Sequence, residues 1–136
     1  MGCDIHLVIE SRSPGGAWEC VSRLPIDEAE YEWEYRNYYG FAVLAGVRNC
    51  SKTGPMAVPI AVPRGFPEDA TQTARDLSDE DFDGHSHSWV TLKEINDYSQ
   101  EWGVLPYTVD ALAREMCNRA KSPNPEDTRA VFFFDN

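Results

Sequence analysis

The sequence lacks several features that would identify its function directly. It has no apolar stretch long enough to cross a membrane and no basic segment followed by an apolar one, so we expect neither a membrane helix nor a signal peptide. Cations are also scarce, because 12 Lys and Arg stand against 23 Asp and Glu, for a net charge of −11. Phosphate binding needs clustered cations, so direct nucleic-acid binding is not expected. A solvated acidic surface or a basic partner protein remains compatible with this charge.

Motifs that would assign an activity are missing too. The chain contains no P-loop, no GxGxxG, no nucleophile elbow and no zinc-finger spacing. Its four cysteines, Cys3, Cys20, Cys50 and Cys117, form no CxxC pair and are too widely separated for a compact disulfide framework. We therefore expect reduced thiols in a cytoplasmic protein, with Cys20 and Cys117 in the core.

The composition that is present favours one folded domain. The chain has 136 residues, of which 42% are hydrophobic and 12% aromatic. That length is common for a single domain, and a disordered chain would be poorer in aromatic residues. We expect residues 1–136 to form a single domain.

Alternation of polar and apolar residues predicts strands at the start of the chain. In "CDIHLVIES", Cys3, Ile5, Leu7 and Ile9 would point one way and Asp4, His6, Val8 and Glu10 the other. The turn residues 13–16 and the segment 17–24 extend this strand into a β-hairpin with a loop of about four or five residues.

Further elements follow from periodicity, caps and turn residues. We expect a loop or irregular helical turn over 27–36, a helix over 37–46 between Asn37 and Gly46, and a Pro- and Gly-rich loop over 50–70. A short helix would begin near 67, with Glu68 and Asp69 in its first turn. An acidic loop (76–84), a strand turning helical (86–100), a helix (108–120) capped by Thr108 and an aromatic strand (128–136) complete the prediction.

This order of elements predicts an α+β fold. We expect a small, mainly antiparallel sheet with two or three helices on one face and a long Pro/Gly-rich loop. The first and last strands are both strongly apolar, so they should be neighbours in the centre of the sheet.

Five blocks of sequence resemble a family of small proteins encoded by tailed bacteriophages, prophages and some bacterial genomes. They are "MGCDIH", "NYYGFAVLAGVRN", "PRGFPEDAT", "DGHSHSWVTLKE" and "RAVFFFDN", and together they cover roughly half of the chain. The resemblance implies a phage or prophage setting and a location in the bacterial host cytoplasm. It supplies no activity.

The histidines suggest a metal site. The chain has three, His6, His85 and His87, and each lies near an Asp. Strand alternation places Asp4 and His6 on one face, about 7 Å apart. An HxH pair on an extended segment would aim both imidazoles the same way. We therefore predict that Asp4, His6, His85 and His87 bind a divalent transition metal, with zinc favoured by three imidazoles.

Other residues would complete such a site. Asp83 or Asp81 is a candidate general base or hydrogen-bond partner of a ligand, and Asp135 at the chain's end could reach the face of Asp4 and His6. Arg64, in an exposed loop, could bind a phosphate or carboxylate, although a surface salt bridge is the commoner role for such a residue.

Three functions remain open at this point. The first is a metal-dependent hydrolase of a phosphoester or nucleotide, with Asp83 and Arg64 in catalysis. The second is a non-enzymatic acidic phage accessory protein that binds and inhibits a host defence protein. The third is a structural phage protein whose histidines only stabilise the fold. Metal-free acid–base chemistry by histidine is a further alternative, and the oligomeric state is not predicted.

Overall fold

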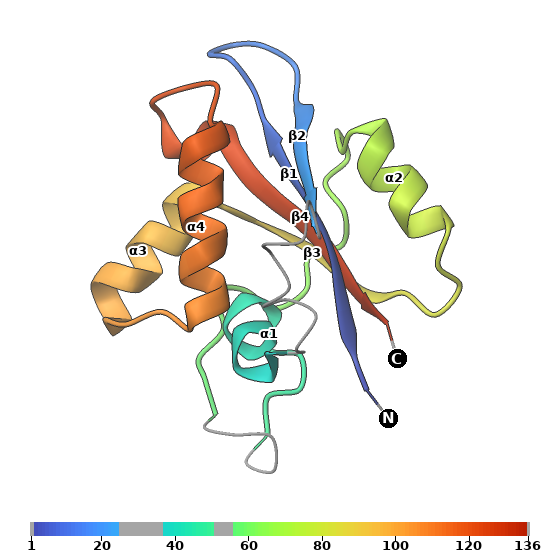
Figure 1. Cartoon of the computed structure of the whole chain (residues 1–136), viewed down its shortest axis with the longest axis vertical. Coiled ribbons are helices and arrows are strands. Elements are labelled where there is room, and N and C mark those ends of the chain that lie inside the picture. The colour runs from blue at the N-terminus through green and yellow to red at the C-terminus, as the bar shows by residue number, and fades with distance from the viewer. Residues whose placement is uncertain (1, 25–36, 51–55, 136) are drawn as a thin grey trace.

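The computed structural model describes residues 2–24, 37–50 and 56–135, and it confirms an α+β fold. The described residues form four strands and four α-helices (Figure 1). In chain order they are β1 (Asp4–Ser11), β2 (Glu19–Leu24), α1 (Tyr38–Ala45), α2 (Gln72–Asp79), β3 (His85–Thr91), α3 (Leu92–Trp102), α4 (Tyr107–Arg119) and β4 (Thr128–Asp135). The loop or turn expected over 27–36 lies outside the described residues.

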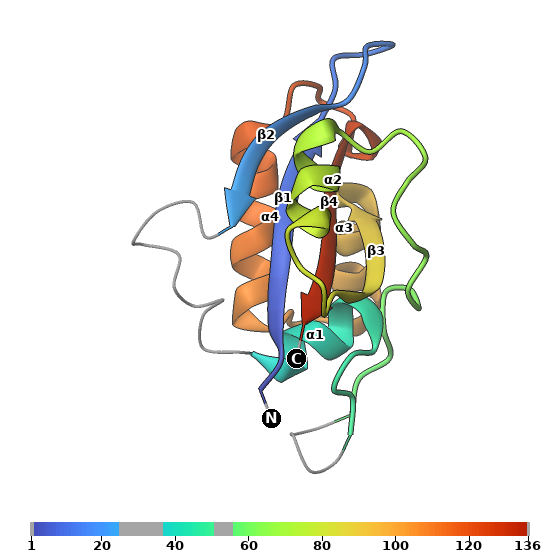
Figure 2. The ribbon, with the colours of Figure 1, turned by 90° about the vertical axis from the view of Figure 1, so that its right-hand side faces the viewer.

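The first and last strands form the centre of the sheet, as predicted. The strand order is β2-β1-β4-β3, and every neighbouring pair is antiparallel. β1 and β4 pair along their whole length, from Asp4 opposite Asp135 to Ser11 opposite Thr128. Both ends of the described chain therefore lie at one end of the sheet (Figure 2).

Alternation along β1 and β4 gives the sheet two different faces. Leu7, Ile9, Phe132 and Phe134 point into the main core, which α1, α3 and α4 cover. Val8 and Val131 point to the opposite face, where they pack with Ala74 of α2. Figures 1 and 2 show α2 on the other side of the sheet from the remaining helices.

The expectation that all helices lie on one face is therefore wrong. The central strands carry apolar side chains on both faces, and each face must be covered to remove these from water. The short helix α2 and the loop before it provide the second cover, through Phe66, Ala70 and Leu77.

Helix ends agree with the sequence in α1 and differ in α2 and α4. Asn37 caps α1, and Gly46 ends it with φ 73°. α2 begins at Gln72, later than expected, because the Thr71 side chain accepts a hydrogen bond from the Ala74 amide. Pro106, not Thr108, precedes α4, and its fixed φ suits a helix start.

Thr108 is instead buried where α1 and α4 meet. A Cβ on Gly40 would lie 2.5 Å from the Thr108 Oγ1 atom, so only glycine fits this contact.

The expected burial of two cysteines needs correction: Cys117 is exposed and Cys20 is only half-buried. The hairpin loop spans residues 12–18, longer than expected. Among the described helices, none has the length and apolar character of a membrane span.

Candidate metal site

The two histidines of the HxH segment point to opposite faces of the sheet, so the prediction that they aim the same way is wrong. Ser86 adopts a left-handed conformation with φ 56°, and the pairing of β3 with β4 slips between His85 and Ser88. The His85 ring faces Phe134, whereas the His87 ring stacks on Phe133, with centroids 5.1 Å apart. A bulge of this kind breaks the simple alternation of a strand.

Three other side chains come together at the end of the sheet. The His6 Nε2 atom lies 2.5 Å from the Asp135 Oδ2 atom and 3.3 Å from the Asp81 Oδ2 atom. The ligand-type atoms of these three residues all lie within 4.8 Å of one another. The side chains are 32%, 23% and 22% exposed, for His6, Asp135 and Asp81 respectively, so the cluster is partly desolvated yet open to solvent.

Distant parts of the chain supply this cluster. His6 lies on β1 opposite Phe133, and Asp135 is the last residue of β4. Asp81 lies in the turn after α2, where its amide donates to the Ser78 carbonyl. The turn passes close to the sheet, because a Cβ on Gly84 would lie 3.0 Å from the Phe133 ring.

Hydrogen bonds favour a charged Asp81. Burial tends to raise the pKa of this carboxyl group, but the hydrogen bond from the Asp83 amide, a hydrogen bond with Asp135 and the charge of His6 together lower it below its usual value. The Asp83 N–H donates to the Asp81 Oδ1 atom over 2.9 Å. A charged Asp81 beside His6 and Asp135 would offer carboxylate oxygen to a cation at this position.

Aromatic stacking fixes the ring of His6. It lies nearly parallel to Phe133, with centroids 4.8 Å apart and an interplanar angle of 13°. His87 stacks on the same Phe133, and Phe66 meets the His87 ring edge-on at 4.9 Å. The two histidines thus flank one phenylalanine across three strands, and only His6 reaches the carboxylates.

We expect His87 to make the protein less stable in mild acid. Burial and the charge of His85 lower the pKa of His87 below that of the unfolded chain. Between these two pKa values the unfolded chain binds more protons, so stability falls as the pH drops below about 6.5 and levels off below the folded pKa. Urea unfolding at several pH values should show this loss, and it should be smaller in His87→Gln. An identical pH dependence in both proteins would contradict the prediction.

The predicted ligands are therefore only partly brought together. Among the side chains that the structure describes, the close ligand group contains His6 but not Asp4, His85 or His87. Asp4 is the register partner of Asp135 and lies beside the group. His87 instead bonds the Ser78 hydroxyl, with 2.9 Å between Nε2 and Oγ.

Arg64 forms the salt bridge that was the commoner expectation for it. Its guanidinium bonds both carboxylate oxygens of Glu94 and stacks over Trp89, 4.5 Å from the ring centroid. The hydrogen bond with Glu94 raises the pKa of Arg64. Two further hydrogen bonds hold the same loop to β3: the Gly65 amide donates to the His87 carbonyl, and the Arg64 amide donates to the Ser88 hydroxyl. Arg64 thus anchors its loop to β3 and α3.

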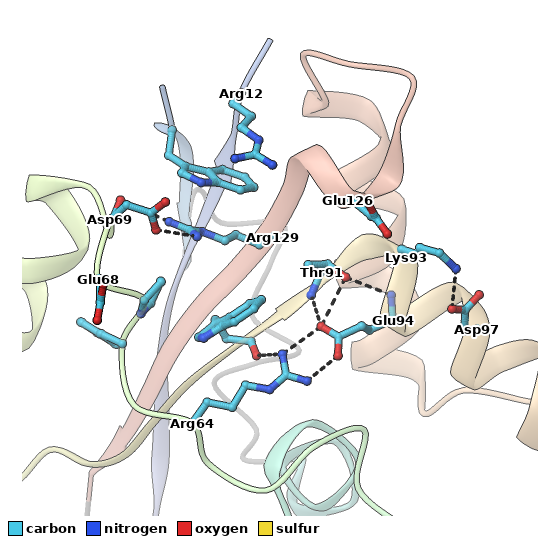
Figure 3. A pocket seen from close by; sticks show the side chains of 14 residues that line it. Arg12, Arg64, Glu68, Asp69, Thr91, Lys93, Glu94, Asp97, Glu126 and Arg129 are labelled. Atoms are coloured by element: carbon cyan, nitrogen blue, oxygen red, sulfur yellow. Dashed lines mark hydrogen bonds and ion pairs between the residues drawn. The ribbon is translucent and has the colours of Figure 1, made fainter. Parts of the chain in front are cut away.

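A groove of about 980 Å³ lies on the face of the sheet that α2 covers. Figure 3 shows the side chains that line it. Its floor holds Arg129, whose guanidinium bonds the buried Glu10 and also Asp69. The Trp18 ring lies between Arg129 and Arg12, at 3.9 and 4.4 Å from their guanidinium carbons. Arg64 and Arg129 each bond a carboxylate from another part of the chain and stack on an indole ring, so they hold these segments together. None of the three residues of the cluster lines the groove.

Comparison with protein-family models, curated proteins and solved structures finds no match to this chain. The geometry of the described residues therefore carries the functional argument. Asp81 and Asp135 were recognised in the sequence only as supporting residues. For Asp135, one signal could have indicated a role as a ligand: the predicted central pairing of the first and last strands, which places Asp135 near His6.

Proposed function

We propose that the chain binds a divalent metal ion through His6, Asp81 and Asp135 and uses it to hydrolyse a phosphoester or nucleotide. The observation that carries this proposal is the convergence of one imidazole and two carboxylates from β1, β4 and the turn after α2. Three protein ligands with remaining positions for water are typical of catalytic rather than structural metal sites.

The ligand types favour some metals over others. Two oxygens and one nitrogen replace the three nitrogens and one oxygen that the sequence suggested. Carboxylate oxygen suits Mn²⁺ as well as Zn²⁺, so both ions are candidates. A bound divalent ion would balance the negative charge of the two carboxylates, and it would lower the pKa of a water molecule that it holds.

Asp83 is the residue that we propose as general base. Its backbone already bonds Asp81, and its own side chain is exposed. A carboxylate beside the ligands could accept a proton from a bound water. Arg64 is left out of the proposed site because Glu94 occupies its guanidinium.

The resemblance supplies no activity, so the proposed substrate class depends on the phage setting that it implies and on the size and charge of the site. A small phosphoester or a nucleotide would be accessible to a partly exposed site at the edge of a small domain. The net charge of −11 would repel the phosphates of a large nucleic acid.

Equilibrium dialysis of untagged protein with Mn²⁺ and Zn²⁺ tests the proposal, together with assays on nitrophenyl phosphomonoesters, phosphodiesters and nucleotides. We expect about one equivalent of bound metal and metal-dependent hydrolysis. Asp83→Asn should keep the metal and lose most of the activity, because it removes the base but no ligand.

Less than about 0.2 equivalents of either metal would overturn the metal site. Activity that persists in a chelator and disappears in His6→Ala would point instead to acid–base catalysis by His6 without metal. Metal binding without hydrolysis of any of these substrates would overturn the enzymatic part of the proposal.

A further inference from the structure

A groove with exposed apolar side chains lies along the C-terminal half of α3, apart from the metal site. We name it the α3 groove, and the apolar residues that line it include Tyr39, Met56, Val58, Tyr98, Trp102 and Val104. Two adjoining hollows of about 170 and 310 Å³ make it up, and both are lined by Val58, Tyr98 and Trp102. Tyr39 of α1 and Tyr98 and Trp102 of α3 contribute to its lining. Figure 1 shows these two helices on the same side of the sheet.

The apolar side chains of the α3 groove are unusually exposed. Val104 is 95% exposed, Met56 69%, and Val58 and Trp102 each 52%. A cluster of this kind on a small domain is a common mark of an interaction site, whereas single exposed apolar residues are ordinary. The groove is also held in shape, since the Tyr98 hydroxyl donates to the Val58 carbonyl over 2.6 Å.

One wall of the α3 groove is acidic. Glu94, Asp97 and Glu101 line the larger hollow, and no Lys or Arg appears among the described residues lining either hollow. Arg64 and Lys93 engage Glu94 and Asp97, so the negative charge of this wall depends mainly on Glu101, within a chain of net charge −11. An occupant should therefore combine apolar side chains with positive charge.

A second copy of the chain does not meet this requirement. It would bring another net charge of −11 and present the same acidic wall to its counterpart. Mutual repulsion opposes such an association. A basic amphipathic segment, in contrast, can place its apolar side chains in the groove and its cations near the acidic wall.

We propose that the α3 groove binds a basic amphipathic segment of a partner protein. The proposal does not depend on the metal site, because none of the three metal-site residues lines the groove. It identifies residues that would contact a partner if the chain is an acidic accessory protein that binds another protein.

The test uses a synthetic amphipathic peptide of about 18 residues with leucines and one tryptophan on one face and lysines on the other. Two control peptides are needed, one with glutamates in place of the lysines and one with the cationic sequence scrambled. Binding to the full chain is measured by calorimetry, and the groove is located by amide chemical shifts in the NMR spectrum. We expect only the amphipathic cationic peptide to bind, and neither control. Its binding should shift the amide signals of Val58, Trp102 and Val104.

Matched variants distinguish the groove from the rest of the surface. Val104→Glu should weaken the peptide at least about tenfold, whereas Val62→Glu, at a 71% exposed valine outside the groove, should change it less than about twofold. Glu101→Gln should weaken binding more than Glu80→Gln. Raising NaCl from about 50 to 300 mM should weaken it several-fold.

Three results would overturn the proposal. They are equal binding of the anionic or scrambled peptide, shifts that avoid the groove, and a dimer in sedimentation that Val104→Glu dissociates. The last result would make a second copy of the chain the occupant.

Discussion

Replacing Asp135 by Asn should weaken Mn²⁺ binding at least about 100-fold, because it removes one of three protein ligands together with its charge. The Asn side-chain oxygen can still accept a hydrogen bond from His6, so the fold should survive. Calorimetric titration gives the affinity. Thermal or urea unfolding provides a second readout. Metal at 100 times its Kd stabilises the native protein by about 2.7 kcal/mol, and after a 100-fold loss of affinity the same concentration should stabilise the variant by about 0.4 kcal/mol or less.

Two variants control for the acidic surroundings of this site. Asp79→Asn removes an exposed carboxylate at the end of α2 that is outside the ligand group. His85→Ala combined with His87→Ala removes the histidines that the sequence had suggested as ligands. Both proteins should keep the native affinity within about threefold. Equal weakening by Asp79→Asn and Asp135→Asn would mean diffuse attraction to an acidic surface and would contradict a defined site.

Replacing Glu10 by Gln should destabilise the fold by about 3–5 kcal/mol, because it leaves the Arg129 charge in the interior without its buried partner. Glu10 is fully buried and Arg129 is 4% exposed, and 2.7 Å separates the Arg129 Nε and Glu10 Oε1 atoms. Asp69 also bonds Arg129 but is itself mostly exposed, so it compensates only in part. For a domain of this size the melting temperature should fall by about 10 °C or more.

Two comparisons test the cause of this effect. Asp97→Asn breaks an exposed ion pair with Lys93 and should cost less than about 1 kcal/mol. Replacing Glu10 and Arg129 together by Met should restore much of the lost stability, because no unpaired charge stays buried. A double variant that is as unstable as Glu10→Gln would show that the packing, rather than the charge, was lost.

The strands show how far local pattern extends in this protein. The alternation around His6 and the aromatic run ending at Asp135 predicted two central strands, and both are confirmed. Pattern failed at β3, where the left-handed Ser86 separates His85 from His87. Serine seldom adopts positive φ, and no residue type in the segment signals a bulge.

The helices show a second limit. Caps that use local side chains were predictable in α1, where Asn37 and Gly46 bound the helix. The start of α2 depends on a long-range contact, since the Thr71 amide donates to the carboxylate of Glu10. Cys117 lies on the α4 surface because the helix turns Leu112 and Met116 inward, and a one-residue error in the predicted face was enough to misplace it.

By itself, the sequence determined the fold class and the central pair of strands, because alternation and composition act locally and repeat along the chain. The tertiary structure alone decided which acids join His6. Asp135 reaches it through the antiparallel register of β1 and β4, and Asp81 through the path of the turn after α2 across Phe133. Residues separated by most of the chain meet only when packing fixes their distances, and no spacing in the sequence encodes those distances.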